Sequence, residues 1–231
     1  MKKLSLILLL GIALAGCSKH EDQARTAKAP SHASSTAASI IPQSQVKAKT
    51  YEGPFGLASS IPIEELEQMG FKKISGRPDA FFFGTPPKPL QDAEEYAVVA
   101  TPVAGSCRII AHIDVPVVNG SGDQLKAKTD QIAEMMALKY GKYSDKVDYI
   151  KQGAYRDNPE FWMLGLKEES IYYAYDWTAQ KTSKPLPAEL ENIEVAADAI
   201  RISSGYVTIK YTFKNFDACH KEIEAKKSNN L

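Results

Sequence analysis

Thiols and imidazoles are the first side chains to consider for chemistry, because together they bind zinc or form a nucleophile–base pair. Two such pairs are close in sequence, namely Cys107 with His112 and Cys219 with His220. If residues 107–112 form a strand, an odd spacing directs Cys107 and His112 to opposite faces. Two adjacent residues are likewise poorly placed to bind one metal ion. We therefore predict neither a metal site nor a cysteine nucleophile, and no cofactor.

Carboxylates are the remaining groups that could do acid–base chemistry. The sequence has no nucleophile-elbow, zinc-protease or phosphate-loop motif. Its Asp and Glu residues are scattered over turns and helix faces, which is typical of a solvated surface. No catalytic residue is predicted, although paired carboxylates acting on cell-wall glycan stay open as an alternative.

An alternating aromatic row could bind a partner. Ile171, Tyr173, Tyr175 and Trp177 share one face of a predicted strand, with Tyr172, Ala174 and Asp176 on the other. Aromatic side chains are enriched at interface hot spots, so Tyr173, Tyr175 and Trp177 could form a platform for a sugar or a protein. Packing of the same row beneath a helix is the other interpretation.

The first seventeen residues predict the compartment. A basic start at Lys2 and Lys3 precedes an apolar run of about ten residues, which is typical of an export signal and too short to span a bilayer. Leu14-Ala15-Gly16-Cys17 resembles the lipobox of bacterial lipoproteins. That resemblance implies a signal peptide over residues 1–16, cleavage before Cys17 and diacylglycerol on the Cys17 sulfur.

The lipid would make the membrane a partner of this protein, because several acyl chains anchor a protein stably. Ser18 follows the acylated cysteine, and lipoproteins of enteric bacteria stay in the inner membrane when Asp stands there. The resemblance thus implies an outer-membrane anchor with the protein facing the periplasm. Loss of Lys2 and Lys3 leaves 26 basic and 28 acidic residues, and this near-neutral balance does not favour nucleic acid as a partner.

Residues 17–50 comprise the acylated cysteine and a segment rich in Ala, Ser, Thr and Lys. Such a composition buries too little apolar surface to fold, so we predict a disordered tether. Once Cys17 is acylated, Cys107 and Cys219 are the only thiols left, and an even pair in an exported protein usually forms a disulfide. Two free buried cysteines are the alternative.

Secondary-structure signals begin near Tyr51. Short helices are predicted after Pro62 and near the C-terminus, and a long helix extends to Tyr140, with Ser121 and Gln124 as a capping box. A first strand covers Phe81–Phe83. Three hairpins are predicted by alternation and turn residues: Glu95–Thr101 with Cys107–Val115, Phe161–Leu166 with Ile171–Trp177, and Ala199–Ile202 with Tyr206–Phe213.

This order of elements predicts an α+β fold, an antiparallel sheet with helices on one face, over residues 51–231. The similar order of helix and strands in residues 51–120 and 121–231 suggests two related halves. The predicted elements do not alternate as strand, helix and strand, and this argues against a parallel doubly wound sheet.

Three stretches carry a family resemblance: Gly53-Pro54-Phe55-Gly56-Leu57, the segment from Gly105-Ser106-Cys107-Arg108-Ile109 toward Lys139-Tyr140-Gly141, and Gly205-Tyr206-Val207 through Cys219. Together they resemble a group of uncharacterised proteobacterial envelope proteins without an established activity. The plan of a helix followed by antiparallel strands is also similar to outer-membrane-assembly lipoproteins of the BamE type and to modules of β-lactamase inhibitor proteins. Fold likeness does not fix function.

These observations favour a non-enzymatic binding or assembly protein of the cell envelope, with an envelope protein as partner. An inhibitor or immunity-type lipoprotein is a special case of this class. The glycan-acting enzyme is the alternative from another class.

Overall fold

One antiparallel sheet with the strand order β1-β2-β3-β7-β6-β5-β4 organises the computed structural model, which describes residues 50–117, 119–151 and 153–228. The predicted signal peptide, the predicted acylation site at Cys17 and the predicted tether lie outside the described residues, except for Thr50. The strands are β1 (Phe81–Phe83), β2 (Glu95–Thr101), β3 (Gly105–Pro116), β4 (Asp145–Ile150), β5 (Ile171–Thr178), β6 (Leu190–Arg201) and β7 (Ser204–Phe213).

The helices of the described residues are α1 (Ile63–Gln68), α2 (Asp123–Tyr140), α3 (Gly153–Asp157), α4 (Trp162–Lys167) and α5 (Phe216–Ser228). Short 3₁₀ turns, η1 (Pro54–Gly56) and η2 (Pro159–Phe161), precede α1 and α4. The predicted α+β class with an antiparallel sheet is confirmed. Strand β3 pairs with β7, so strands from residues 51–120 and 121–231 belong to one sheet.

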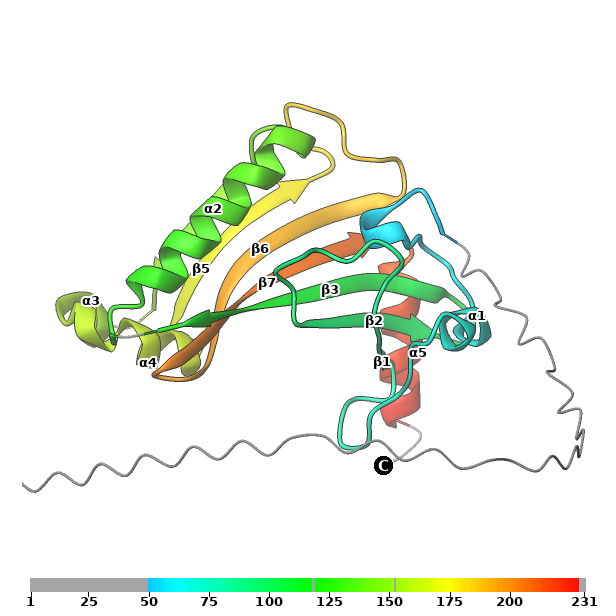
Figure 1. Ribbon diagram of the computed structural model, residues 1–231, viewed down its shortest axis with the longest axis horizontal. Helices are drawn as coiled ribbons and strands as arrows, with labels where there is room; N and C mark the ends of the chain where they lie inside the picture. Colours follow the sequence, from blue (N-terminus) through cyan, green and yellow to red (C-terminus); the bar gives the residue numbers. More distant parts are fainter. Residues whose placement is uncertain (1–49, 118, 152, 229–231) are drawn as a thin grey trace, which may run out of the picture. The chain divides into compact units, whose positions relative to one another are not determined.

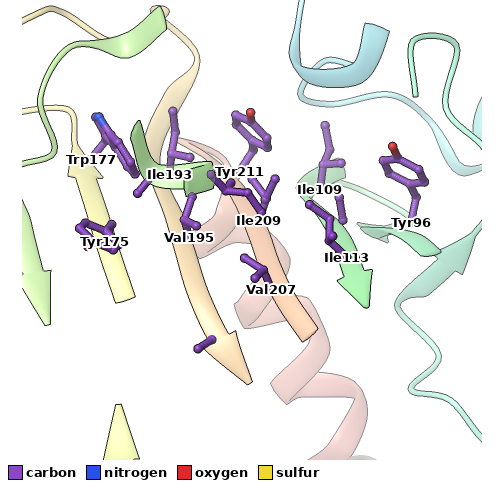
Figure 2. Close-up of a cluster of buried hydrophobic side chains, with 14 of the residues drawn as sticks. Tyr96, Ile109, Ile113, Tyr175, Trp177, Ile193, Val195, Val207, Ile209 and Tyr211 are labelled. Atoms are coloured by element: carbon purple, nitrogen blue, oxygen red, sulfur yellow. The ribbon is translucent and has the colours of Figure 1, made fainter. Parts of the chain in front are cut away.

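The main core lies between one face of this sheet and helices α1, α2 and α4. Side chains from neighbouring strands project to the same side in Figure 2, among them Tyr96, Ile109, Val195 and Tyr211. Helix α2 contributes Leu125 and Ile132 to this cluster, and Figure 1 shows it lying along β5 and β6. We call this side of the sheet the helix face.

Helix α5 packs on the opposite face, against β2 and β3. A second, smaller cluster fills that contact, with Val99, Cys107, Ile110 and Cys219 among its buried members. Most helices thus share one face, as expected, and α5 adds a cover on the other side.

The predicted strand Phe161–Leu166 is wrong, because residues 162–167 form α4. A short apolar run has no clear period, so strand and helix cannot be told apart from it. Strand β5 pairs instead with β4 and β6. Strand β4 was missed because its sequence is polar and mostly exposed.

The capping box at Ser121 is also wrong. Helix α2 begins after Gly122, which has a left-handed conformation with φ 65°. The Ser121 hydroxyl donates to Asp123 Oδ2 at 2.7 Å instead of capping a backbone N–H. The close approach of Trp162 explains this start, because a Cβ on Gly122 would lie 2.3 Å from Trp162 Cε3.

Candidate binding site in a fork of the sheet

The structure buries the aromatic row that the sequence left open as a binding platform. Tyr173, Tyr175 and Trp177 are at most 6% exposed and lie beneath α2 on the helix face; Figure 2 shows two of them. Trp177 Nε1 donates to the carbonyl of Gly141 at the end of α2, at 2.7 Å. The row is therefore part of the core, and Tyr173, Tyr175 and Trp177 do not form an exposed binding face.

The two tyrosine hydroxyls of this row attach the sheet to α2. Both donate to Asp130 Oδ1, each at 2.6 Å. Burial is the main cause that raises the pKa of Tyr173 above its usual range, followed by the Asp130 carboxylate. These hydroxyls stay protonated and structural at physiological pH.

The predicted disulfide between Cys107 and Cys219 is present, with Cα atoms 6.4 Å apart. It anchors α5 to the sheet together with Glu222, whose carboxylate accepts from Thr101 Oγ1 and the Ala104 N–H, both at 2.9 Å. Both thiols are consumed, so neither is a nucleophile or a zinc ligand. His112 lies near Glu95 instead, with Nδ1 to Oε1 at 3.3 Å.

The prediction that Cys107 lies on the face opposite His112 was wrong, although the predicted partner of Cys107 was right. A β-bulge leaves Cys107 unpaired with β2, because Val99 pairs with Arg108 and Ala100 pairs with Ser106. The bulge breaks the two-residue alternation. Cys107 therefore shares the α5 side with Ile110, and not the helix face with Ile109.

Strands β4 to β7 carry a band of polar side chains on the side that points away from α2, which we call the open face. One row across it consists of Asp145, Asp176, Glu194 and Lys210, on four neighbouring strands. Glu194 pairs with Lys210 at 2.6 Å. Burial, then the charges of Glu194 and Asp145, raise the pKa of Asp176 to about 6.

Beside this row the sheet forks. Strands β5 and β6 pair from Thr178 and Asn192 up to Ala174 and Ala196, and their pairing ends there. Beyond that point residues 171–173 pair only with β4, and residues 197–199 pair only with β7. We call these two segments the strand fork. Helix α4 contacts both strands there, and Figure 1 shows it close to their ends.

A cavity of about 270 Å³ occupies the strand fork. Its apolar wall includes Leu166 of α4 and the alanines of both strands, and its polar rim includes Glu169, Asp198 and Lys210. Tyr172 also lines it and is 45% exposed. This ring lies across from Tyr149 of β4, with ring centroids 6.5 Å apart. The exposed aromatic pair thus lies on the face of β5 opposite the row considered from the sequence.

The sequence contained part of the signal for this site. Alternation along β5 assigns Tyr172, Ala174 and Asp176 to one face. Glu194 and Asp198 alternate in the same way with buried residues of β6. The position of the fork depends on where α4 packs, however, and the misassignment of residues 161–166 as a strand concealed it.

Within the described ranges, no three His, Cys, Asp or Glu side chains form a group that could hold a metal ion. None of the helices in the described part of the chain is long and apolar enough to cross a membrane. No protein-family model matches the chain, and no curated protein or solved structure matches it significantly.

Proposed function

We propose that this protein is an outer-membrane-anchored periplasmic lipoprotein that binds an envelope protein non-enzymatically through its open face. The lipobox at Cys17 supplies the anchor. The buried disulfide supports an oxidising compartment, because such bonds persist in exported proteins.

The strand fork is the observation that carries the binding role. In a fully paired sheet, each inner strand has a strand partner along both of its edges. The fork instead leaves one edge of each strand without a strand partner, beside a cavity. Unpaired strand edges are templates for another chain. The like charges of Asp176 and Glu194 lie beside it, on paired positions of β5 and β6, and this repulsion costs stability that a bound partner can offset.

Cross-linking in intact cells tests this role. We would replace Ala196, on the open face, with photo-reactive benzoylphenylalanine and analyse adducts by mass spectrometry. The matched control is the same replacement at Leu138, which is 87% exposed on α2. We expect a defined protein adduct from position 196 and none from position 138. Identical adducts from both positions, or none from 196, would contradict the proposal.

An inhibitor or immunity-type protein is the special case in which the captured partner is an enzyme or toxin. In that case, adding this protein to the purified partner should reduce the partner's activity in proportion to the amount of complex that forms.

A glycan-acting enzyme is the second candidate, and one observation favours it. Asp176 and Glu194 are paired across β5 and β6, and its raised pKa makes the Asp176 carboxyl easier to protonate than an ordinary Asp. Glycosidases use such a pair as acid and base. Turnover of purified cell-wall glycan by the wild type, lost in Asp176→Asn and Glu194→Gln, would support the enzyme; no turnover would exclude this role for the pair.

A further inference from the structure

The chemistry of the strand fork specifies the kind of partner segment that it can hold. Its two inner edges belong to residues 171–173 and 197–199, and neither edge pairs with a strand on that side. The Ala199 N–H donates to its neighbour's carboxylate, Asp198 Oδ1, at 2.8 Å. An extended peptide offers main-chain donors and acceptors at the spacing that such edges require.

The size of the cavity favours one side chain of a larger partner. At about 270 Å³ it is smaller than the roughly 300–1,000 Å³ of sites that enclose a complete small ligand. Its wall of Leu166 and alanines suits an aliphatic stem.

The charges around the cavity indicate which chemical group the end of that side chain carries. Three carboxylates line the cavity, from Glu169, Glu194 and Asp198, against one ammonium group, Lys210. Because Lys210 is paired with Glu194 at 2.6 Å, the charges of Glu169 and Asp198 are left to attract a cation. The half-exposed ring of Tyr172 lines the same cavity, and an aromatic ring attracts cations to its face.

We infer that the strand fork binds an extended segment of a protein partner and takes one basic side chain, Lys or Arg, into its cavity. The stem of that side chain lies along the apolar wall, and its cationic end reaches Glu169 and Asp198. The main chain of the segment pairs with the two strand edges that lack a strand partner on that side. This inference rests on the proposed binding function and specifies the chemistry of its partner.

An NMR titration with four probes separates the contributions of the side-chain charge, the main-chain donors and the amine alone to binding. The protein is the isotope-labelled globular region linked to its own tether, without the lipid. The probes are the blocked pentapeptide Thr-Val-Lys-Val-Thr, the same peptide with Gln for Lys, the Lys peptide N-methylated at both valines, and butylamine. We expect the Lys peptide to shift the amide signals of residues 171–173 and 197–199. Loss of the charge or of the main-chain donors should each weaken binding by about tenfold or more. Butylamine should not compete.

Protein variants provide the reciprocal test. Asp198→Asn keeps an acceptor for the Ala199 N–H but removes the charge, and Glu169→Gln removes the second charge. Each substitution should weaken binding of the Lys peptide by about tenfold and leave the affinity for the Gln peptide unchanged. Glu64→Gln, an equal charge change on exposed α1, is the matched control and should leave both affinities unchanged.

Three results would overturn the inference: equal affinities for the Lys and Gln peptides, signal changes outside the fork, or no saturable change with any peptide. Tight binding of butylamine alone would assign the cavity to free amines. Because the peptide comparison uses wild-type protein, it stands even if a variant folds poorly. A partner captured at position 196 together with no peptide binding would leave the proposed function intact and remove the basic-peptide assignment.

Discussion

Asp176 lies where partial burial and like charge act in the same direction. Its side chain is flanked by Glu194 on β6 and Asp145 on β4, and burial is the largest cause that raises its pKa from 3.8 to about 6. The folded state therefore holds this proton more tightly than the unfolded state does. Stability must fall as pH rises from about 4 to about 6, because the folded state then loses a proton that the unfolded chain has already lost.

Asp176→Asn should stabilise the protein at pH 7. The difference between 3.8 and about 6 corresponds to about 3 kcal/mol, which solvent screening of a partly exposed group reduces to about 1–2 kcal/mol. Urea unfolding across a pH series measures this gain, which should vanish near pH 4. Asp148→Asn is the matched control, because Asp148 is exposed on β4 and lies outside the row formed by Asp145, Asp176, Glu194 and Lys210. A gain that is constant with pH would contradict this explanation.

The Cys107–Cys219 bond closes a loop with a sequence separation of 112. In the chain-entropy account, closing so long a loop in the unfolded chain raises the free energy of unfolding by about 4 kcal/mol. Replacing either cysteine with Ser should lower the melting temperature of the oxidised protein, and reductant should destabilise only the wild type. Equal sensitivity of wild type and variant to reductant, in calorimetry with matched samples, would count against this stabilising role.

At the residue scale, the disulfide pairing could be predicted from the number of cysteines and the expected compartment. The face of the sheet to which each cysteine points could not be predicted. The Cys107–Cys219 pair was predicted by taking the chain as exported and Cys17 as acylated, which leaves two thiols. The side to which Cys107 points depends on a bulge between Val99 and Ala100, for which the alternation of residue types gives no signal. The same limit applies to Tyr173 and Tyr175, since a strand pattern does not say which face a helix will cover.

At the scale of elements, the junction before α2 is the most constrained. Gly122 has φ 65°, and a Cβ there would lie 2.3 Å from Trp162 Cε3. The ring belongs to α4, so this glycine fixes how closely the start of α2 and α4 approach. Trp162 in turn packs edge-on against Tyr173 of β5, with ring centroids 6.0 Å apart.

Gly122→Ala should therefore destabilise the protein by about 2–4 kcal/mol, the sum of left-handed backbone strain and a clash in the core. Gly153→Ala is the matched control, because a Cβ at Gly153 has no neighbouring atom within 4 Å and alanine favours the helix by about 0.5–1 kcal/mol. Chemical denaturation of both variants measures the contrast. Equal effects of the two substitutions would exclude the packing explanation.

Elements with a strong period were predictable, and those defined by their neighbours were not. Helix α2 and strands β2, β3 and β7 follow their hydrophobic patterns. Strand β6 begins at Leu190, well before the predicted Ala199, although the buried Ile193, Val195 and Ala197 alternate with the less buried Glu194, Ala196 and Asp198. Strand β4 is defined by pairing with β5, and α4 by packing beneath the fork, so their local sequences carry little signal.

At the scale of the whole molecule, pairing of β3 with β7 makes one sheet from segments far apart in the chain. The disulfide and Glu222 attach the C-terminal helix to the β2–β3 hairpin. The proposed binding surface and the proposed membrane anchor thus belong to separate parts of the sequence. The fork consists of residues 171–173 and 197–199, whereas the proposed anchor is Cys17.

This separation leads to a prediction about localisation that does not depend on binding. Replacing residues 1–17 with an ordinary secretory signal removes the proposed acylation site and still directs export, so the protein should move from the membrane pellet to the soluble periplasmic fraction. The disulfide should still form, and the melting temperature of the described domain should not change, because the two core clusters of the described residues consist of side chains from residues 51–223. Detergent-free fractionation and calorimetry provide the two measurements.

Ser18→Asp is the matched variant, because it keeps the lipid and changes only the residue that directs lipoproteins between membranes. By the rule that the lipobox resemblance implies, it should shift the protein from the outer to the inner membrane in a density gradient, with total membrane binding unchanged. A membrane-bound protein after loss of Cys17 would contradict lipid anchoring. An unchanged gradient position for Ser18→Asp would contradict only the outer-membrane assignment, so the two variants separate attachment from destination.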